Sequence, residues 1–395
     1  MDPILMDLLS LVIRWLHVIA GIAWIGASFY FIWLDNSLRA PPAWKAERGV
    51  KGDLWAFHGG GIYEVAKYAA APPRMPKTLH WFYWEAYSTW ITGMLLAVAV
   101  YYLQAESFLV NSAGPLSGPA AAIAASLALI ALAAALYEAL MRSGVAARGA
   151  LLAVVALPLL CAYSYGLGWL FSGRAAYVHL GMALGTIMVG NVFFGIIPAQ
   201  RRFVAQLEAG EEPDAAPLAR AKLRSTHNNY MTLPVLFCMI SAHYPLLYGH
   251  RHSWLLLVAI TLIAGTARHY FNLRHRGIVK PGILAGCALA FAALAVALLL
   301  DGRASAESAG GAVPEDAAAM SIVAEHCTVC HAPAPSHSAY SAPPGGLVFA
   351  HRDDLAALAD KAIVSVRSHY MPLGNLTGMS EQQRQQLLVW LHSLN

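Results

Sequence analysis

Long apolar runs alternate with short polar connections along most of the chain. A helix needs about 20 apolar residues to cross a bilayer, and eight runs are long enough. They lie at 9–34, 79–103, 118–141, 148–171, 175–199, 227–248, 253–273 and 281–300. Several have Trp and Tyr near their ends, as is typical of an interfacial belt. The pattern predicts an all-α fold, with an eight-helix transmembrane bundle over residues 1–300.

The charged positions give this bundle an orientation. Only 12% of residues are charged, against roughly 25% in soluble proteins. Seventeen Lys and Arg lie in the connections after spans one, three, five and seven, whereas the other connections hold only Arg174 and Arg251. The positive-inside rule places the first set in the cytoplasm. Both termini are therefore predicted to face the periplasm, across a bacterial inner membrane. The net charge of +4 gives no indication of nucleic-acid binding.

The pattern changes after residue 300. Residues 301–313 are rich in Gly, Ala and Ser and predict a flexible linker. Residues 314–395 predict a separate soluble domain. Within it, Cys327-Thr328-Val329-Cys330-His331 reads C-x-x-C-H, the attachment pattern for one covalent haem c. The two thiols would add to the porphyrin vinyl groups, and His331 would bind the iron. A zinc site would need four ligands, and the sequence has no second Cys pair.

A second iron ligand is expected further along the same domain. Met371, followed by Pro372, is the first candidate, and Met379 is the alternative. A thioether ligand raises the potential of haem iron, which suits an electron acceptor. The segment resembles the small class I cytochromes c, with a helix before the motif, a middle helix near 353–370 and a last helix from Ser380.

Histidines within the predicted spans are a further candidate for chemistry, because ionisable side chains in a bilayer are costly and often functional. His17 and His179 lie in spans one and five, and His80 and His227 open spans two and six, which hints at a 4+4 repeat. We expect one or two b-type haems, with His17 and His179 as one axial pair. The other candidate iron ligands are His80, His227, His243 and His269. Alternatively, these side chains bond to neighbours or face lipid headgroups.

Several segments resemble one family. Residues 15–31 (WLHVIAGIAWIGASFYF) are similar to the opening of bacterial membrane-bound urate oxidases with a C-terminal cytochrome c domain. Residues 58–63 (HGGGIY), 226–231 (THNNYM) and 371–375 (MPLGN) match as well, so the resemblance covers essentially the whole chain. It implies oxidation of urate to 5-hydroxyisourate, with electrons passed to cytochrome c and the respiratory chain and no hydrogen peroxide formed.

A urate site needs cationic or amide donors, an aromatic wall and a proton acceptor. The predicted cytoplasmic side offers these groups. Glu64 or His227 is the candidate base, and Arg268 is the candidate catalytic cation. The candidate substrate-binding residues are Asn229, Tyr63 and His58. The glycines at 59–61 can also be read as a simple turn.

Two other classes of protein remain open from the sequence. One is a membrane haem protein that carries electrons between quinol and cytochrome c and has no purine substrate. The other is a purine transporter fused to a redox sensor. The expected partners of the favoured enzyme are urate, the lipid bilayer and a downstream cytochrome c or terminal oxidase. Reduction of the haem by urate would support the enzyme, reduction by quinol but not by urate would support the electron carrier, and substrate uptake that survives loss of Cys327 would support the transporter.

Overall fold

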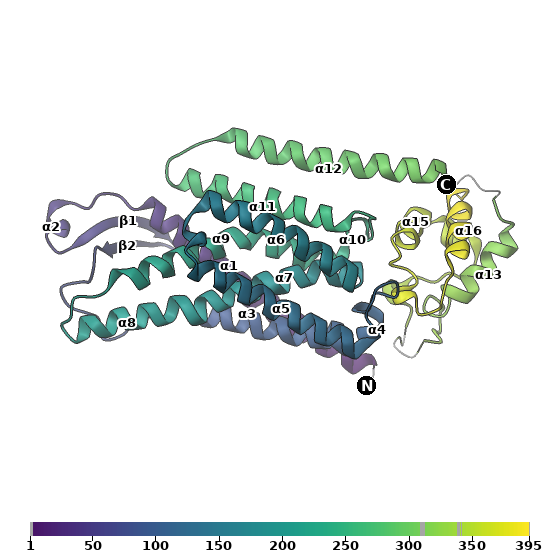
Figure 1. Ribbon diagram of the computed structural model, residues 1–395, viewed down its shortest axis with the longest axis horizontal. Helices are drawn as coiled ribbons and strands as arrows, with labels where there is room; N and C mark the ends of the chain where they lie inside the picture. Colours follow the sequence, from purple (N-terminus) through teal and green to yellow (C-terminus); the bar gives the residue numbers. More distant parts are fainter. Residues whose placement is uncertain (1–2, 309–312, 338–339, 341, 395) are drawn as a thin grey trace.

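Long helices lie side by side along one direction of the molecule (Figure 1). The computed structural model describes residues 3–308, 313–337, 340 and 342–394. The long helices are α1 (Pro3–Ser37), α3 (Trp84–Leu96), α5 (Pro119–Arg142), α6 (Gly149–Leu170), α7 (Gly173–Gly190), α8 (Ile197–Glu208), α9 (Ala215–Ile240), α11 (Ser253–His275) and α12 (Pro281–Ser308). Shorter elements join them: α2 (Ala43–Ala46), α4 (Ala105–Phe108), α10 (Pro245–Tyr248), the π-helical turns η1 (Ala97–Tyr102) and η3 (Asn191–Ile196), and the 3₁₀ turns η2 (Val145–Ala147) and η4 (Ser241–His243).

Six helices in the described chain are long and apolar enough to cross a membrane. They are α1, α5, α6, α11, α12 and the continuous helix from α7 through η3 to α8. The predicted span 79–103 is the shorter helix α3 with η1. The predicted span 227–248 is the second half of α9, which ends at Ile240 and carries charged residues in its first half. The structure thus supports six of the eight predicted spans by length and composition.

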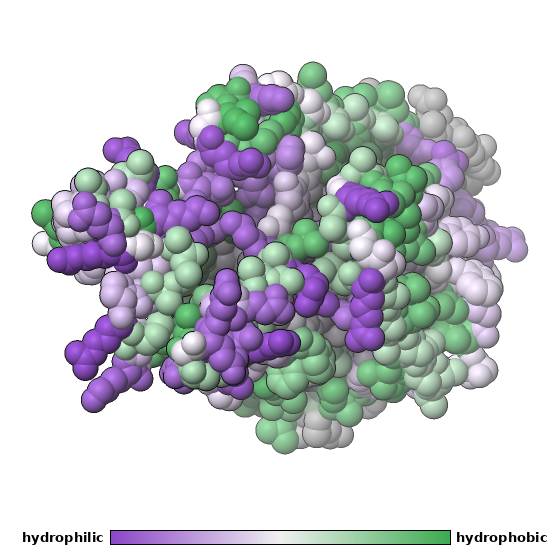
Figure 2. All heavy atoms as spheres, turned by 60° about the vertical axis from the view of Figure 1, so that its left-hand side comes forward, coloured by the Kyte–Doolittle hydropathy of each residue, from purple (hydrophilic) through white to green (hydrophobic). Residues whose placement is uncertain are grey.

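The outer faces of the helices suit a lipid environment. Ile22 on α1 is 68% exposed and Leu289 on α12 is 72% exposed, although both are large apolar side chains. A helix that is apolar on its outer face is typical of a membrane span. Figure 2 brings the left-hand end of Figure 1 forward, and hydrophilic side chains gather there while hydrophobic ones cover the flank.

The connection after α1 contains a β-hairpin, so the all-α prediction was wrong here. Strand β1 (Val50–His58) pairs antiparallel with β2 (Gly61–Tyr68). Both strands contain aromatic and β-branched residues, which strands favour. Gly59 and Gly60 have φ of +57° and +83° and form the tight turn between them. The alternative interpretation of residues 59–61 as a simple turn therefore agrees with the backbone conformation.

The C-terminal segment forms a small helical domain with its own core. Its elements are α13 (Asp316–His326), η5 (Pro344–Gly346), α14 (Arg352–Ala356), α15 (Ala359–Arg367), η6 (Leu373–Asn375) and α16 (Glu381–His392). Trp390 is fully buried, and its indole N–H donates to Asp316 at 2.8 Å, which joins the last helix to the first. Ser380 and Gln383 form the capping box that begins α16.

The linker and the two ends of the chain have a clear arrangement. Helix α12 continues to Ser308, so helix replaces the predicted flexible chain up to that residue, and residues 309–312 lie outside the described chain. The start of α1 and the C-terminal domain lie at one end of the bundle, at the right in Figure 1, and the hairpin lies at the other. Termini on one side agree with an even number of crossings.

Candidate functional site

A pocket of about 440 Å³ opens between α1, α9 and α11, near the end of the bundle that carries the hairpin. Its volume lies in the range of small-molecule sites. The lining is largely aromatic and includes two basic side chains. The residues are Phe29, Tyr30, Trp33, Leu233, Arg268, Phe271 and His275. This composition suits a flat ligand with polar edges.

Arg268 is the central polar group of this pocket. Its side chain is almost fully buried, and its guanidinium lies 3.9 Å from the ring centre of Phe29. Its Nε donates to Oδ1 of Asn229 at 3.0 Å. Its Nη2 and the Nδ2 of Asn229 are buried with no hydrogen-bond partner among the described residues. Buried donors without partners are costly, so this pair of residues is prepared for a ligand with acceptor atoms.

Helix α11 adds further unpaired groups to the same side. Residues 268, 272 and 275 follow the spacing of one helical face. The Oδ1 of Asn272 and the Nδ1 of His275 are buried and also lack a partner among the described residues. His275 lines the pocket. The pocket lining therefore combines the guanidinium of Arg268 with the imidazole of His275, which can take up a proton.

His227, a candidate base, faces another part of the bundle. It lies two residues before Asn229, which places the two side chains on nearly opposite sides of α9. Its Nδ1 lies 2.9 Å from the hydroxyl of Tyr137 on α5. That hydroxyl accepts from Asn191 on η3 at 3.0 Å, and Asn191 in turn bonds to Arg224 at 2.7 Å. The structure thus places His227 in a polar network that joins three helices.

Glu64, the other candidate base, is part of the hairpin. It is paired with Lys45 on α2, which also binds Asp53. The Asp53 and Glu64 carboxylates raise the pKa of Lys45. Both acids lie on one face of the hairpin, because Glu64 pairs with Trp55 across the strands and Asp53 lies two residues before it. Glu64 therefore fixes α2 onto the hairpin and does not line the pocket.

The two other hairpin candidates lie close to the turn. His58 is the last residue of β1, and Tyr63 is the third residue of β2. Both side chains are exposed. Neither lines the pocket around Arg268. Among the predicted substrate contacts, the structure brings Asn229 to Arg268 and leaves these two at the hairpin.

His17 points from α1 toward α3. Its Nδ1 lies 3.0 Å from the carbonyl of Thr89 and 3.1 Å from the hydroxyl of Thr92. The absence of a side chain at Gly93 makes room for this ring, because a Cβ there would lie 3.0 Å from its Cε1. The Nε2 of His17 is therefore the atom that faces away from these partners.

His179 on α7 is fully buried, and both ring nitrogens have partners. Its Nδ1 donates to the carbonyl of Ala175 at 2.7 Å, and its Nε2 accepts from the hydroxyl of Ser126 at 2.6 Å. The ring stacks on Phe171 with centres 4.6 Å apart. Iron would need the lone pair that Ser126 occupies. The residues as arranged do not fit a His17–His179 haem pair, which stays a prediction from sequence.

Apart from His227, the other candidate iron ligands in the bundle are exposed. His80 precedes α3 and packs against Phe82 with ring centres 4.6 Å apart. His243 lies in η4 at the opposite end. His269 bonds to the hydroxyl of Tyr230 at 2.7 Å. Exposed rings at helix ends match the alternative that these histidines face headgroups or bond to neighbours.

The C-x-x-C-H motif lies at the end of α13. His331 is buried, and its Nδ1 donates to the carbonyl of Leu347 at 3.1 Å. A carbonyl can only accept, so Nδ1 carries the proton and Nε2 keeps its lone pair for a metal. Burial lowers the pKa of His331, which favours the neutral imidazole that a ligand must be. Together with Cys327 and Cys330, this residue set fits covalent haem c.

The two candidate methionines differ in their surroundings. Met379 is buried in the core of the C-terminal domain. Met371 is half-buried, and its backbone is fixed by a hydrogen bond to Ser365 at 2.9 Å and by one from Arg384 at 2.7 Å. The choice between them as the second iron ligand remains a prediction.

One known protein family matches the part of the chain that forms the helical bundle. The family described as urate oxidase N-terminal matches residues 3–299. The chain belongs to this family. No curated protein and no solved structure matches the chain. The matched range of this urate oxidase family holds every residue of the pocket around Arg268 and ends before the C-terminal domain. Membership indicates that the chain is an oxidoreductase and that its function is related to urate.

Sequence reasoning found Arg268 and Asn229 but missed most of the lining. The aromatic residues Phe29 and Trp33 are four apart on α1, which places them on one face. His275 follows Arg268 by seven residues on α11, the same face again. A search for polar and aromatic residues at helical spacing, near the ends of different spans, would have indicated these positions.

Proposed function

We propose that the chain oxidises urate to 5-hydroxyisourate in the pocket around Arg268, passes the electrons to the C-terminal domain, and forms no hydrogen peroxide. The observation that carries this proposal is the buried Arg268, which lines an aromatic pocket and is bonded to Asn229, while its Nη2 and the Nδ2 of Asn229 lack partners among the described residues. Membership of the urate oxidase N-terminal family supports the choice of substrate.

Urate matches the chemistry of this pocket. It is a planar purine anion with carbonyl oxygens along its edges. The guanidinium of Arg268 offers a charge and a free N–H, and the amide of Asn229 offers a second donor. Charge-assisted hydrogen bonds of this kind are strong, and a guanidinium can contact two acceptors at once. Aromatic side chains of α1 would stack on the faces of the ring.

The reaction must release two electrons and two protons. Urate and one water molecule give 5-hydroxyisourate, two protons and two electrons. In our proposal His275 accepts a proton, because its Nδ1 has no partner in the described part of the chain and its ring lines the pocket. This assigns to His275 the role that the sequence offered to Glu64 or His227. The largely aromatic lining would limit the access of other water molecules to the reacting ring.

The C-terminal domain would receive the electrons. Cys327 and Cys330 would attach haem c, His331 would be its proximal ligand, and Met371 is the first candidate for the opposite side. When bound, this group supplies a one-electron acceptor of raised potential. The positive-inside count favours a periplasmic position for this domain in a bacterial inner membrane. A downstream cytochrome c or terminal oxidase would then take the electrons.

Anaerobic addition of urate to the purified, oxidised, full-length protein in nanodiscs tests the proposal. The haem absorption bands would change to the reduced form, with two electrons delivered per urate consumed. In air, with an electron acceptor present, urate consumption would produce no hydrogen peroxide. The same experiment with quinol tests the main alternative, an electron carrier without a purine substrate. Reduction by quinol but not by urate would refute the proposal.

A further inference from the structure

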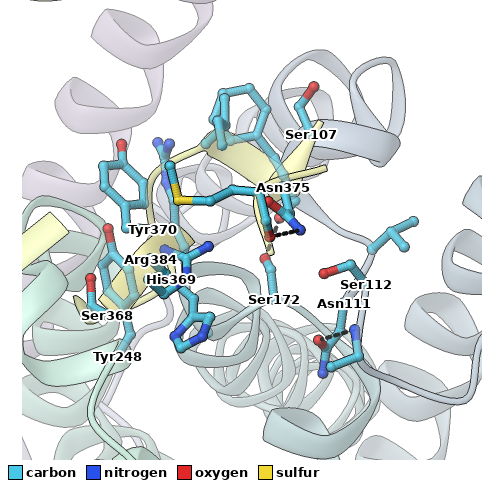
Figure 3. Close-up of a pocket in the computed structure, with 18 of the residues that line it drawn as sticks. Ser107, Asn111, Ser112, Ser172, Tyr248, Ser368, His369, Tyr370, Asn375 and Arg384 are labelled. Atoms are coloured by element: carbon cyan, nitrogen blue, oxygen red, sulfur yellow. Dashed lines mark hydrogen bonds between the residues drawn. The ribbon is translucent and has the colours of Figure 1, made fainter. Parts of the chain in front are cut away.

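One side chain of the C-terminal domain packs against the core of the bundle. Tyr370, between α15 and η6, packs against the cluster of buried residues that closes this end of the bundle. Its ring meets Tyr248 edge to face, with ring centres 5.7 Å apart. Figure 3 shows both rings on the same side of the cavity between the two parts. The C-terminal domain therefore docks on the bundle through the contact between Tyr248 and Tyr370, which we call the seat.

Two glycines allow the backbones of the two parts to touch. A Cβ on Gly249, which follows α10, would lie 1.9 Å from Cβ of Ser368. Gly374 in η6 has φ of +57°, and a Cβ there would lie 2.9 Å from the carbonyl oxygen of Glu106 in α4. Neither contact leaves room for a side chain. Gly249 belongs to the bundle and Gly374 to the C-terminal domain, so each part contributes one close approach.

The seat is narrow. A cavity of about 610 Å³ lies beside it, between the bundle and the domain. Its lining comes from both parts and includes Ser107, Asn111, Ser172, Tyr248, Tyr370 and Arg384 (Figure 3). Because this space is not filled by side chains, a few contacts hold the domain in place. A single substitution at one of them can therefore change its position.

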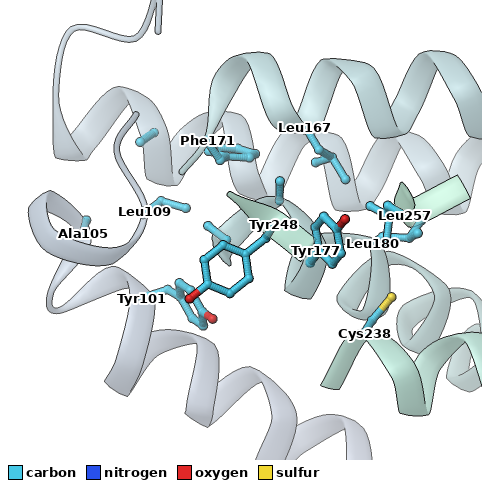
Figure 4. Close-up of a cluster of buried hydrophobic side chains, with 13 residues drawn as sticks. Tyr101, Ala105, Leu109, Leu167, Phe171, Tyr177, Leu180, Cys238, Tyr248 and Leu257 are labelled. Atoms are coloured by element: carbon cyan, nitrogen blue, oxygen red, sulfur yellow. The ribbon is translucent and has the colours of Figure 1, made fainter. Parts of the chain in front are cut away.

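The same seat connects to the middle of the bundle through aromatic rings. Tyr248 lies against Tyr177 with ring centres 6.3 Å apart. Tyr101, in the same buried cluster, lies 6.2 Å from the ring of His179, measured between ring centres. Figure 4 shows the tyrosines of the bundle gathered in this cluster. On the other side of the seat, Tyr370 directly precedes Met371, the candidate iron ligand.

We propose that the C-terminal domain is docked on the bundle while it accepts electrons. The contact between Tyr248 and Tyr370, which the close approaches at Gly249 and Gly374 allow, holds it in this position. This inference rests on the proposed function. Each urate releases two electrons, so the domain accepts one, passes it to an external one-electron acceptor, and then accepts the second. Tyr370 is a positioning residue in this scheme. The domain would not need to swing between the bundle and its acceptor.

Gly249→Ala tests the docking in the full-length protein. Hydrogen exchange of residues 105–110, 245–252 and 370–376 is measured without urate, and the rate of haem reduction is measured with urate and separately with ascorbate. We expect faster exchange in all three segments. If the clash lowers the docked fraction to about a tenth, reduction by urate slows about tenfold. Reduction by ascorbate, which reaches the domain from solution, keeps its rate. Gly168→Ala is the matched control, because a Cβ there meets open space.

Tyr370→Leu and Tyr370→Phe provide a second test that does not depend on Gly249. The leucine variant would slow reduction by urate, whereas the phenylalanine variant, which keeps the ring, would retain most of the rate. Faster exchange in Gly249→Ala with an unchanged rate of reduction by urate would overturn the inference and leave the proposed function standing. Unchanged exchange would overturn the role of Gly249. If urate reduces not even the wild type, the proposed function has failed, and this inference fails with it.

Discussion

Two buried cations lie at the same end of the molecule and differ in how completely they are paired. Lys45 binds the carboxylates of Asp53 and Glu64, and these acids raise its pKa. Arg268 has one hydrogen bond to a neutral amide and stacks on Phe29, and its Nη2 has no partner among the described residues. Lys45 is neutralised within the fold, whereas Arg268 keeps a charge and a donor for something else.

This difference separates structural from functional polar groups more reliably than residue type does. A buried charge that is fully paired stabilises one arrangement of the chain, and breaking the pair is costly. A buried donor without a partner lowers stability, so its presence needs another explanation. The two histidines His179 and His275 repeat the contrast. Both ring nitrogens of His179 are bonded, and the Nδ1 of His275 is free within the described chain.

Removal of the Arg268 charge should have the largest effect. We expect Arg268→Ala to lower kcat/KM for urate about 1,000-fold, in the range found for loss of a preorganised electrostatic contact. Arg268→Lys should lie between this variant and the wild type, because an ammonium lacks the planar pair of donors. Anaerobic reduction of the haem bands by urate measures both.

Arg220→Ala is the control for Arg268, since Arg220 is an exposed arginine on α9. It should leave the kinetics unchanged. If Arg268→Ala kept normal kinetics, or if both variants lost activity equally, the unpaired donor would have no special role and the comparison with Lys45 would fail.

The second effect concerns the proposed proton acceptor. We expect His275→Asn to lower kcat for urate about 100-fold with a smaller change in KM, because general base catalysis acts mainly on the chemical step. His227→Asn should change kcat much less, since His227 bonds to Tyr137 away from the pocket. Steady-state kinetics of the two variants make a matched pair. A larger loss in His227→Asn would reverse our assignment of the base.

Part of this contrast could be predicted from the sequence. Arg268 and Asn229 stand out because each is polar within an apolar run, and a bilayer makes such residues costly. The partners of Lys45 could not be found in this way. They depend on the register of the hairpin, which places Asp53 and Glu64 on one face. A search for helical spans passes over a hairpin, although its aromatic and β-branched residues and the glycines of its turn were visible in the sequence.

The same limit explains why the structure does not bring some of the predicted site residues together. Glu64 has the right chemistry for a base, but its cross-strand position gives it to Lys45. His17 and His179 are predicted as a pair by their places in two spans, yet each is bonded to a different helix, to α3 and to α5. Sequence position fixes the depth of a residue in the bundle. It does not fix which way the helix is turned.

Replacement of Lys45 should change the hairpin and leave catalysis nearly intact. In Lys45→Met the carboxylate of Asp53 would stay buried without its cation, and hydrogen exchange of residues 50–68 should become at least about tenfold faster. The kcat and KM for urate should remain close to those of the wild type. Lys51→Met, an exposed position on the same hairpin, is the control and should change neither property. Loss of urate oxidation with normal exchange in Lys45→Met would contradict a purely structural role.

The smallest effect concerns the pH dependence of the hairpin. The pKa of Lys45 is raised in the folded protein, so its contribution to stability is fully present below the pKa of an unfolded lysine, about 10.4. That contribution is lost as the pH rises through the higher pKa of the folded state. Fluorine NMR of fluorotryptophan at Trp44 and Trp55, which flank the Lys45 ammonium, should show constant signals from neutral pH to about 10 and a change only above it. Lys51→Met should keep this alkaline change and Lys45→Met should lack it. A change at lower pH, or one that survives in Lys45→Met, would mean that another group holds the hairpin together.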